Sequence, residues 1–503
     1  MSYTEQDLYL LKLHNKSVRM KVDLLNENYA KIDSLVGRIV SVSYDIASSS
    51  DIRRTANLNL AVDNASYLEL DFEKTWIKRM VELSCGIYNP QTKEYVWYAL
   101  GRMLMASGKT EYDATSMNVN LSLVDLMGYL TENRGSQLGH DHMVEVDSNV
   151  RNAIRATIAE YSPFKRTSVP EFEDTVPYDI TVNMGGYPIE ILKTLLNLYP
   201  YYEMFYDKDG VFIVQEIPTK ISDPIDLPKE VVNEILISED RSIDFSKVKN
   251  TTEVWGRELD ATYTALNTTS TGSRYDVYIS NTFEALTVGE TYMIVPPVTS
   301  VAGQTMKIQD TTEYAIYKQL GNGTFTAIDA GAMEADRLYV IMYVDEKFVL
   351  QGEAFVHAIV QEIDAEPSER AKQKFKEDNN CNDVRWVINP DSPFACTEEP
   401  NTHSIERQIK QVLFNGEYED IYTTQLAIER AGYENWKKTR LQDTMTLEML
   451  LVPWLDVNDK LEYTSPTNGD VTVVLVQSID YDFEKWTMSV KASRFYPYYP
   501  FTD

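Results

Sequence analysis

The chain has 503 residues and a formal net charge of −30 at pH 7, from 77 acidic and 47 basic side chains. Proteins that bind nucleic acid or anionic membranes need clustered Lys and Arg, so this excess of carboxylates excludes sequence-specific nucleic-acid binding and loose membrane binding. The apolar content of 43% is typical of a globular protein. The length predicts roughly three to four folded domains, not a disordered chain.

The three cysteines, Cys85, Cys381 and Cys396, lack the CxxC spacing of a zinc or redox site. We expect buried reduced thiols, with pairing of Cys381 and Cys396 as the alternative in an oxidising compartment. The N-terminus carries no basic segment followed by an apolar one, and no run of about 18 apolar residues occurs. We therefore expect neither secretion nor membrane insertion, and synthesis in the cytoplasm.

The first part of the chain predicts a short helix followed by an antiparallel β-domain. Thr4 and Asp7 form a capping pattern for a helix over residues 4–14. Alternating apolar and polar residues then predict half-buried strands over 18–24, 40–44, 56–62, 94–105 and 117–123. We expect a turn at residues 106–109 and a short helix that starts at residues 124–127. Such a series of strands indicates a barrel or a strongly curved sheet.

A small α/β module is predicted next. A helix over residues 146–161 ends at Pro163, and a strand over 178–182 precedes a mostly apolar helix over 188–199. A hairpin then turns at residues 207–210. The mixture of helices and short strands distinguishes this region from the β-domain before it.

The rest of the chain returns to strands. Residues 260–355 are rich in Thr, Gly and Tyr and contain short strands separated by turn signals, which indicates a β-sandwich. Helices are expected over 367–378 and 421–440, and further strands over 446–495.

The predicted fold class is mainly β with α+β parts: two β-barrels, a small α/β module and an inserted β-sandwich. The expected domains are a first barrel with an N-terminal helix (1–130), a helical and α/β module (131–244), a strand that returns to a barrel (245–259), the inserted sandwich (260–358), a helical connecting domain (359–440) and the C-terminal part of a second barrel (441–503).

No catalytic motif is complete in the sequence. Gly108-Lys109-Thr110 resembles the end of a phosphate-binding loop, but Met103 replaces its first glycine and strands flank it on both sides. Gly321-Asn322-Gly323 lacks the third glycine and the helix of a dinucleotide site. No GxSxG elbow occurs. We expect no cofactor and no enzymatic activity.

The densest histidine cluster is His140-Asp141-His142, with Glu145 and Asp147 close behind. Imidazole and carboxylate together can hold a metal ion, but no third histidine is near, so a solvated polar loop is the preferred interpretation. His403 lies near Cys396 in sequence, without the fold context that Cys/His catalysis requires. The 33 tyrosines are mostly in predicted strands, where packing is the usual role and a sugar-binding platform the alternative.

Four stretches, in a fixed order, carry a resemblance to a known family. They are Trp97-Tyr98-Ala99-Leu100-Gly101 with residues 119–125, the module over 188–215, Val254-Trp255-Gly256, and residues 451–460 with the strands that follow to Pro497. In this order they resemble the tail hub proteins of tailed bacteriophages, the group that includes baseplate hubs. Residues 389–394 and 416–418 resemble elements of one branch of that group. The similarity spans roughly 15–255 and 360–497, so that 260–355 looks like an insertion. The residues that carry it are Trp97, Gly101, Asp125, Trp255, Gly256, Pro453, Trp454, Asp456 and Asn458.

The resemblance implies assembly and not catalysis. Members of the family form a homotrimeric ring in which each subunit contributes two barrels similar to those of the tail tube. The ring joins a sixfold tube to a threefold tip and leaves a channel for DNA and the tape-measure protein. The implied partners are a distal tail or tail tube protein, the tape-measure protein and tail-tip or receptor-binding proteins. The implied location is the phage tail of the virion.

The acidity fits this expectation, because phosphates pass most freely along a wall that does not bind them. Acidic surfaces are also common without any channel. Two alternatives stay open: a tail-tip adhesion protein that binds host glycans through the 260–358 sandwich, and a tail-associated lysin. The lysin is less favoured because the sequence ends directly after the last barrel strand, where a lytic domain would be expected to follow.

Overall fold

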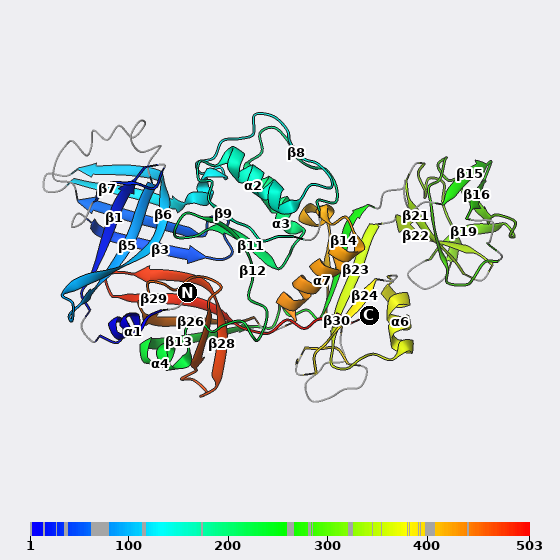
Figure 1. The fold of residues 1–503 in the computed structure, drawn as a ribbon. Helices are drawn as coiled ribbons and strands as arrows, with labels where there is room; N and C mark the ends of the chain where they lie inside the picture. The colour runs from blue at the N-terminus through cyan, green and yellow to red at the C-terminus, as the bar shows by residue number, and fades with distance from the viewer. Residues whose placement is uncertain are drawn as a thin grey trace. The chain divides into compact units, whose positions relative to one another are not determined.

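The computed structural model folds into two compact units, Met1–Val248 with Trp436–Pro500 and Lys249–Asn435 with Phe501–Asp503 (Figure 1). The structure describes residues 3–13, 16–26, 28–34, 39–61, 80–112, 117–172, 175–258, 266–279, 283, 285–319, 325–335, 337–344, 346–353, 355–379, 381, 383–390, 392, 394–397, 408–439 and 442–502. The motif at 321–323 and the histidines His14 and His403 lie outside the described residues, as do parts of the 389–394 motif.

A single antiparallel sheet dominates the first unit and contains twelve strands, counted over the described residues. Its order is β13-β26-β29-β28-β3-β4-β7-β6-β5-β1-β2, with β27 beside β28. The strands are β1 (Val18–Leu25), β2 (Lys31–Ser34), β3 (Ile39–Ala47), β4 (Arg54–Ala61), β5 (Met80–Asn89), β6 (Glu94–Tyr112), β7 (Met117–Asp125), β13 (Leu236–Asp244), β26 (Gln442–Leu450), β27 (Lys460–Thr464), β28 (Val471–Asp482) and β29 (Thr487–Arg494).

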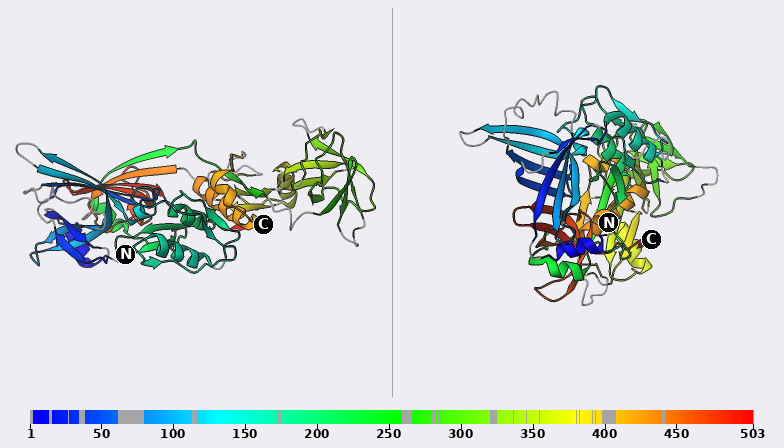
Figure 2. Two further views of the ribbon diagram at one scale, coloured as in Figure 1. Left: turned by 90° about the horizontal axis from the view of Figure 1, so that it is seen from above. Right: turned by 60° about the vertical axis from the view of Figure 1, so that its left-hand side comes forward.

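The mainly β class is confirmed, with a nearly closed, barrel-like sheet. The two β regions expected as separate barrels are joined in one sheet, because β28 pairs antiparallel with β3. We call this pairing of β3 with β28 the seam. Figure 2 shows the early and late strands of this unit lying side by side. One apolar core runs under both regions, from Leu58 and Leu121 to Leu447 and Val490.

Two expectations for this sheet are wrong. The turn expected at residues 106–109 lies inside β6, which accommodates a bulge between Met105 and Ser107 and continues to Tyr112. The strand expected to return to a barrel over 245–259 does not do so: β14 (Thr251–Glu258) pairs with strands of the second unit. The returning strand is β13, whose exposed and polar residues hide the alternation of a half-buried strand.

Helices of the first unit follow the sequence signals. The helix α1 (Glu5–Leu11) begins with the predicted capping box of Thr4 and Asp7. The short helix expected to start at residues 124–127 is the 3₁₀ helix η3 (Leu126–Tyr129), and Asp125 caps it. The module contains α2 (Val150–Tyr161), α3 (Pro188–Asn197), β8 (His142–Val144), β9 (Thr167–Ser168), β10 (Ile180–Val182), β11 (Tyr202–Tyr206) and β12 (Phe212–Glu216), and the unpredicted α4 (Lys229–Ile235) follows it.

The second unit contains a five-stranded sheet of order β25-β14-β23-β24-β30. The new strands are β23 (Phe355–Ile363), β24 (Val384–Ile388), β25 (Lys410–Leu413) and β30 (Phe501–Thr502). The region expected as a helical connecting domain therefore holds strands as well as α6 (Glu369–Asn379), η4 (Gly416–Asp420) and α7 (Thr424–Lys438). No helix among the described residues is long and apolar enough to cross a membrane.

The inserted region forms a β-structure with its own core, which includes Tyr275, Met306 and Phe348. Its strands follow one path, β15-β16-β18-β19-β22-β21-β17, with β20 beside β19. A bridge between Leu266 and Ile294 joins the two ends of this path. The strands are β15 (Asn267–Thr271), β16 (Arg274–Tyr278), β17 (Thr291–Ile294), β18 (Thr305–Ile308), β19 (Tyr314–Gln319), β20 (Phe325–Ala327), β21 (Tyr339–Tyr343) and β22 (Phe348–Glu353).

Candidate functional site

One face of the twelve-stranded sheet carries polar side chains in register across eight adjacent strands, and we call it the polar face. Residues directly opposite each other in an antiparallel pair share a face. The pairings connect Ser238, Asp240 and Ser242 on β13; Thr444, Thr446 and Glu448 on β26; Ser489, Lys491 and Ser493 on β29; Ser478, Asp480 and Asp482 on β28; Ser41, Ser43 and Asp45 on β3; Thr55, Asn57 and Asn59 on β4; Asn118, Asn120 and Ser122 on β7; and Ser107, Lys109 and Glu111 on β6.

Over the residues just given, the polar face is poor in cations. Lys109 and Lys491 are the only basic residues in the set just given, and Lys109 donates to Glu111 at 2.5 Å. The remaining side chains are carboxylates or small neutral groups, mostly Ser, Thr and Asn. Asn57 shows how these groups bond to one another, because it donates to Ser43 and accepts from Ser122. Such a surface offers polyanions few contacts that would hold them.

Two carboxylates meet on the polar face at the seam. Asp45 on β3 lies directly opposite Asp480 on β28. Burial raises the pKa of Asp45 to about 6, and the neighbouring charge of Asp480 acts in the same direction. The seam between the two β regions therefore contains a like-charge contact whose ionisation depends on pH.

A buried arginine joins three segments of the first unit. Arg54, at the start of β4, is 2% exposed. Its guanidinium donates to the Tyr206 carbonyl at 2.9 Å and forms an ion pair with Asp456, in the loop before β27. Its backbone N–H donates to Asp125 at 3.0 Å. We call this contact set the Arg54 junction, and it links the N-terminal strands, the module and the C-terminal strands.

A second arginine extends the junction. Arg53 is 3% exposed and forms an ion pair with Glu203 on β11, and its guanidinium lies 3.5 Å from the centre of the Phe205 ring. Asn458 donates to the same Glu203 carboxylate at 2.6 Å. Glu203 thus connects Arg53, the residue just before β4, to the C-terminal loop through the module.

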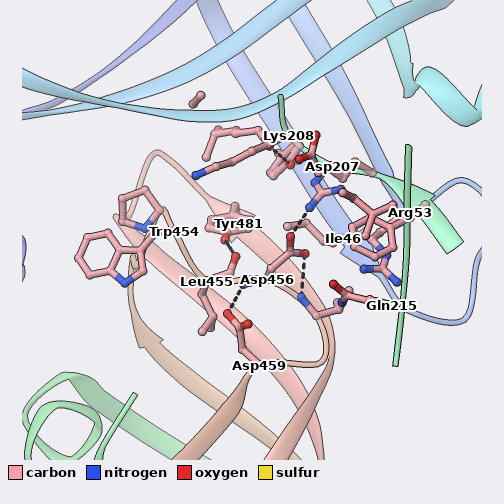
Figure 3. A pocket seen from close by; sticks show the side chains of 18 residues that line it. Ile46, Arg53, Asp207, Lys208, Gln215, Trp454, Leu455, Asp456, Asp459 and Tyr481 are labelled. Carbon is pink, nitrogen blue, oxygen red and sulfur yellow. Dashed lines mark hydrogen bonds and ion pairs between the residues drawn. The ribbon is translucent and has the colours of Figure 1, made fainter. Parts of the chain in front are cut away.

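A cavity of about 240 Å³ lies beside the Arg54 junction (Figure 3). Asp456, which pairs with Arg54, lines this cavity, and its backbone N–H donates to Asp459 at 2.8 Å. Burial raises the pKa of Asp459 to about 8, with the nearby Asp226 and Asp456 charges adding to the effect. Burial likewise raises the pKa of Asp125 to about 6. This concentration of buried charge is costly unless each group is paired, so the contacts have to form together.

Most of the residues singled out in the sequence converge on the junction. Asp125 and Asp456 contact Arg54, and Asn458 contacts Glu203. Gly101 leaves room there, since a Cβ at this position would lie 3.3 Å from Arg54 Cδ. Pro453 and Trp454 line the cavity.

The other three residues lie elsewhere. Trp97 packs on Gly86 in the outer part of the first sheet. Trp255 stacks on His357 in the second unit, with ring centres 3.8 Å apart. At Gly256 a Cβ would lie 2.5 Å from the Ile421 carbonyl oxygen.

The two arginines at the centre of the junction, Arg53 and Arg54, were not identified from the sequence. Arg53 and Arg54 are adjacent basic residues at the start of a strand in a strongly acidic chain, and that pattern was the available signal. Glu203 carries no comparable sequence signal, because it lies on an ordinary amphipathic hairpin strand.

Within the described part of the chain no group of three or more His, Cys, Asp or Glu side chains is arranged to hold a metal ion. The His142 Nδ1 lies 2.8 Å from the Tyr161 hydroxyl, and the His140 Nδ1 lies 2.9 Å from the Asp141 carbonyl oxygen. The cysteines Cys85, Cys381 and Cys396 are free and buried. Burial raises the pKa of each thiol, which suits structural and not nucleophilic residues.

The chain is similar in sequence to one family model, a domain of unknown function (DUF5048), over residues 391–499. No curated protein matches it. Among solved structures it is similar to the 43 kDa tail protein of prophage MuSo2 from Shewanella oneidensis, with a TM-score of 0.45 and 10% identity over 94% of this chain and 98% of that one. It is also similar to a tail protein from Neisseria meningitidis MC58, with a TM-score of 0.44 and 9% identity over 95% and 96% of the two chains. A third, prophage tail protein gp18 from Listeria monocytogenes EGD-e, has a TM-score of 0.39 and 7% identity, over 94% of each chain.

Proposed function

We propose that the protein is a structural tail hub of a bacteriophage or phage-like particle. In this role it forms a homotrimeric ring that joins the sixfold tail tube to the threefold tail tip. The observation that carries the proposal is the polar face, which runs without interruption from β13 to β6 across the seam. A surface of this extent, built from two distant parts of the chain, suits the wall of a channel.

The chemistry of the polar face suits the passage of DNA. A phosphate chain that meets clustered Lys and Arg releases counterions and binds, and each such contact would slow its movement. Carboxylates repel the phosphates, and Ser, Thr and Asn offer neutral hydrogen-bonding groups that water can replace. The polar face would therefore line the channel through which DNA and the tape-measure protein leave the particle.

The Arg54 junction supplies the rigidity that such a wall needs. It ties β4, β11 and the loop that contains Asp456, so the two β regions and the module hold one geometry. In the proposed ring the two β regions act as two tube-like halves of each subunit. The partners would be the tail tube or distal tail protein on one side, tail-tip or receptor-binding proteins on the other, and the tape-measure protein inside.

Electron microscopy of purified tails tests this role. A gold label on an affinity tag at the chain terminus should mark one ring at the junction between tube and tip, with threefold symmetry. Absence of the label from particles, or a label along the whole tube, would rule out a hub. A zymogram of the purified protein without clearing is expected for a structural component.

A second role is proposed for the inserted region, as an adhesion element that binds glycans on the host surface. The observation in its favour is that it has a core of its own while Tyr278 is 46% exposed and Phe325 is 37% exposed. Aromatic side chains on a surface can stack on sugars. Glycan-array binding by the full chain, lost on Tyr278→Ala and retained on Glu334→Ala at an exposed position away from Tyr278, would support adhesion. No binding to any glycan would exclude it.

A further inference from the structure

The two ends of the twelve-stranded sheet carry opposite charge. In the part of the chain that the structure describes, β13 pairs only with β26, and β2 pairs only with β1. The strand β1 meets β2 only at its last residues, Asp23 to Leu25, so its first half has an open edge there. Open strand edges in a soluble protein are normally covered or protected.

The β1 end is basic, and its charges are held in place by aromatic rings. The guanidinium of Arg19 lies 5.0 Å from the centre of the Tyr95 ring, and Lys21 Nζ lies 5.0 Å from that of Trp97. Trp97 in turn rests on the bare backbone of Gly86, where a Cβ would lie 2.7 Å from the indole. Arg19 is exposed and forms no ion pair with any of the residues that the structure describes. A fixed cation loses less conformational entropy on binding than a free one.

Next to these cations, β2 adds Lys31 and the apolar Ile32, whose side chain is 48% exposed. We call Arg19, Lys21, Lys31 and Ile32 the basic end of the sheet. Lys31 and Lys21 share Asp23, which is buried, so the group as a whole keeps a positive charge.

The β13 end is acidic and apolar. Asp240 is exposed on the polar face, and Arg241 is already neutralised by a bidentate pair with Asp443. On the opposite face of β13, Ile237 is 56% exposed and Ile243 is 40% exposed. We call Asp240, Ile237 and Ile243 the acidic end of the sheet. Large apolar side chains that stay exposed on an open edge indicate an interaction surface.

From the charges and exposed apolar residues at these two ends, we infer that each end binds a second copy of this chain. The basic end of one copy meets the acidic end of the next, with Ile32 packing near Ile237 and Ile243. Such a contact uses different surfaces on the two partners, so it propagates head to tail and closes into a ring when the rotation allows. This inference rests on the proposed ring and names the surfaces that build it.

Two other interpretations of the basic end explain less. Cations on an open edge can serve only to prevent aggregation, but the exposed isoleucines at both ends would then be a liability. A sugar would need open ring faces, whereas Trp97 lies on Gly86 and the rings of Tyr95 and Trp97 already carry Arg19 and Lys21. A second copy of this acidic chain accounts for both features, because it would pair with the cations and cover the exposed isoleucines.

Sedimentation velocity of the full chain, measured over a range of salt concentrations, tests the inference. The wild-type protein should self-associate, and the association should weaken as salt rises because exposed charges are screened. Arg19→Glu with Lys21→Glu should weaken association by about tenfold or more, and Asp240→Lys with Ser242→Lys by a similar factor. The control Arg370→Glu, an exposed reversal on α6, should leave association unchanged.

The combined variant with all four changes separates a lost interface from a lost fold. It restores opposite charges between the two ends, so it should recover most of the association that each pair of changes removes. Circular dichroism should show the same β-structure in all variants. Because Lys21 pairs with the buried Asp23, the two variants that carry Lys21→Glu should melt at a lower temperature than the wild type and within a degree or two of each other, so their difference in association is not a difference in folding. Wild-type self-association that is unaffected by either pair of changes would contradict the inference and leave the proposed hub standing. A wild-type chain that stays monomeric at all concentrations would also contradict it, while the gold-labelled tails decide the hub itself.

Discussion

Arg54 and Asp456 form an ion pair across 402 positions of sequence, and Arg54 is almost fully buried. Removing one partner of such a pair leaves the other charge without compensation, which costs far more than the pair itself gains. The pair therefore holds the N-terminal and C-terminal β regions in one arrangement. Its loss should destabilise the whole first unit.

Arg54→Met should lower the free energy of unfolding by about 3 kcal/mol, because Asp456 and the Tyr206 carbonyl both lose their donor. Urea unfolding followed by fluorescence measures this. The matched control Arg370→Met, at an exposed position, should change stability by about 0.5 kcal/mol or less. Equal effects of the two changes would show that the junction does not stabilise the sheet.

The seam should respond to pH through Asp45. Its folded-state pKa is raised from the ordinary 3.8 to about 6, so its contribution to stability is present below the unfolded pKa and is lost as pH rises through about 6. Because Asp45 is only half-buried, screening limits the effect to about 1 kcal/mol. Asp45→Asn should raise the melting temperature at pH 8 and not at pH 4. A shift of the same size at both pH values would argue against this titration.

The Trp97 ring packs on Gly86 and leaves no room for a side chain at that position. A methyl group at this position would lie 2.7 Å from Trp97, inside contact distance, and either the indole or strand β5 must move. We expect Gly86→Ala to destabilise the protein by about 1–3 kcal/mol and to change Trp fluorescence. Gly139→Ala is the control, since nothing lies within 4 Å of the added atom there. Unchanged stability of Gly86→Ala would mean that Trp97 is free to leave its position.

Cations on the polar face should slow the passage of DNA. Asn57→Lys places a positive charge among neutral groups in the middle of that face, where a phosphate chain could bind it. Phage that carry this change should assemble normally and eject DNA more slowly, with the delay reduced at high salt. Asn267→Lys, an exposed change in the inserted region, should leave ejection unaffected. Equal rates of DNA ejection for the two variants would show that the polar face does not line the channel.

Local signals predicted the local structure well. The Thr4–Asp7 box, the short helix that starts at residues 124–127 and the strand over 117–123 all form where the residues indicate. These elements depend on contacts between near neighbours, so a short window of sequence contains the necessary information.

Which distant strands pair with each other could not be predicted from the sequence, for a physical reason. The seam joins residues near Asp45 to residues near Asp480, and nothing in either strand specifies the other. The strand β13 was not predicted because its apolar residues Ile237 and Ile243 are exposed, so the strand lacks the alternation of buried and exposed residues that indicates a half-buried strand. In the candidate site, Asp125 and Asp456 were identified in the sequence, while their common partner Arg54 emerged only when the three segments met in space.

In the proposed hub, the polar face lines a channel formed by three copies of the chain. Electron cryomicroscopy of the protein assembled with its tail tube measures this most directly. We expect a threefold ring in which Asn57, Asp45 and Asp480 face the central axis. A ring whose polar face points outward, or an assembly in which one copy stands alone beside the tube, would contradict it.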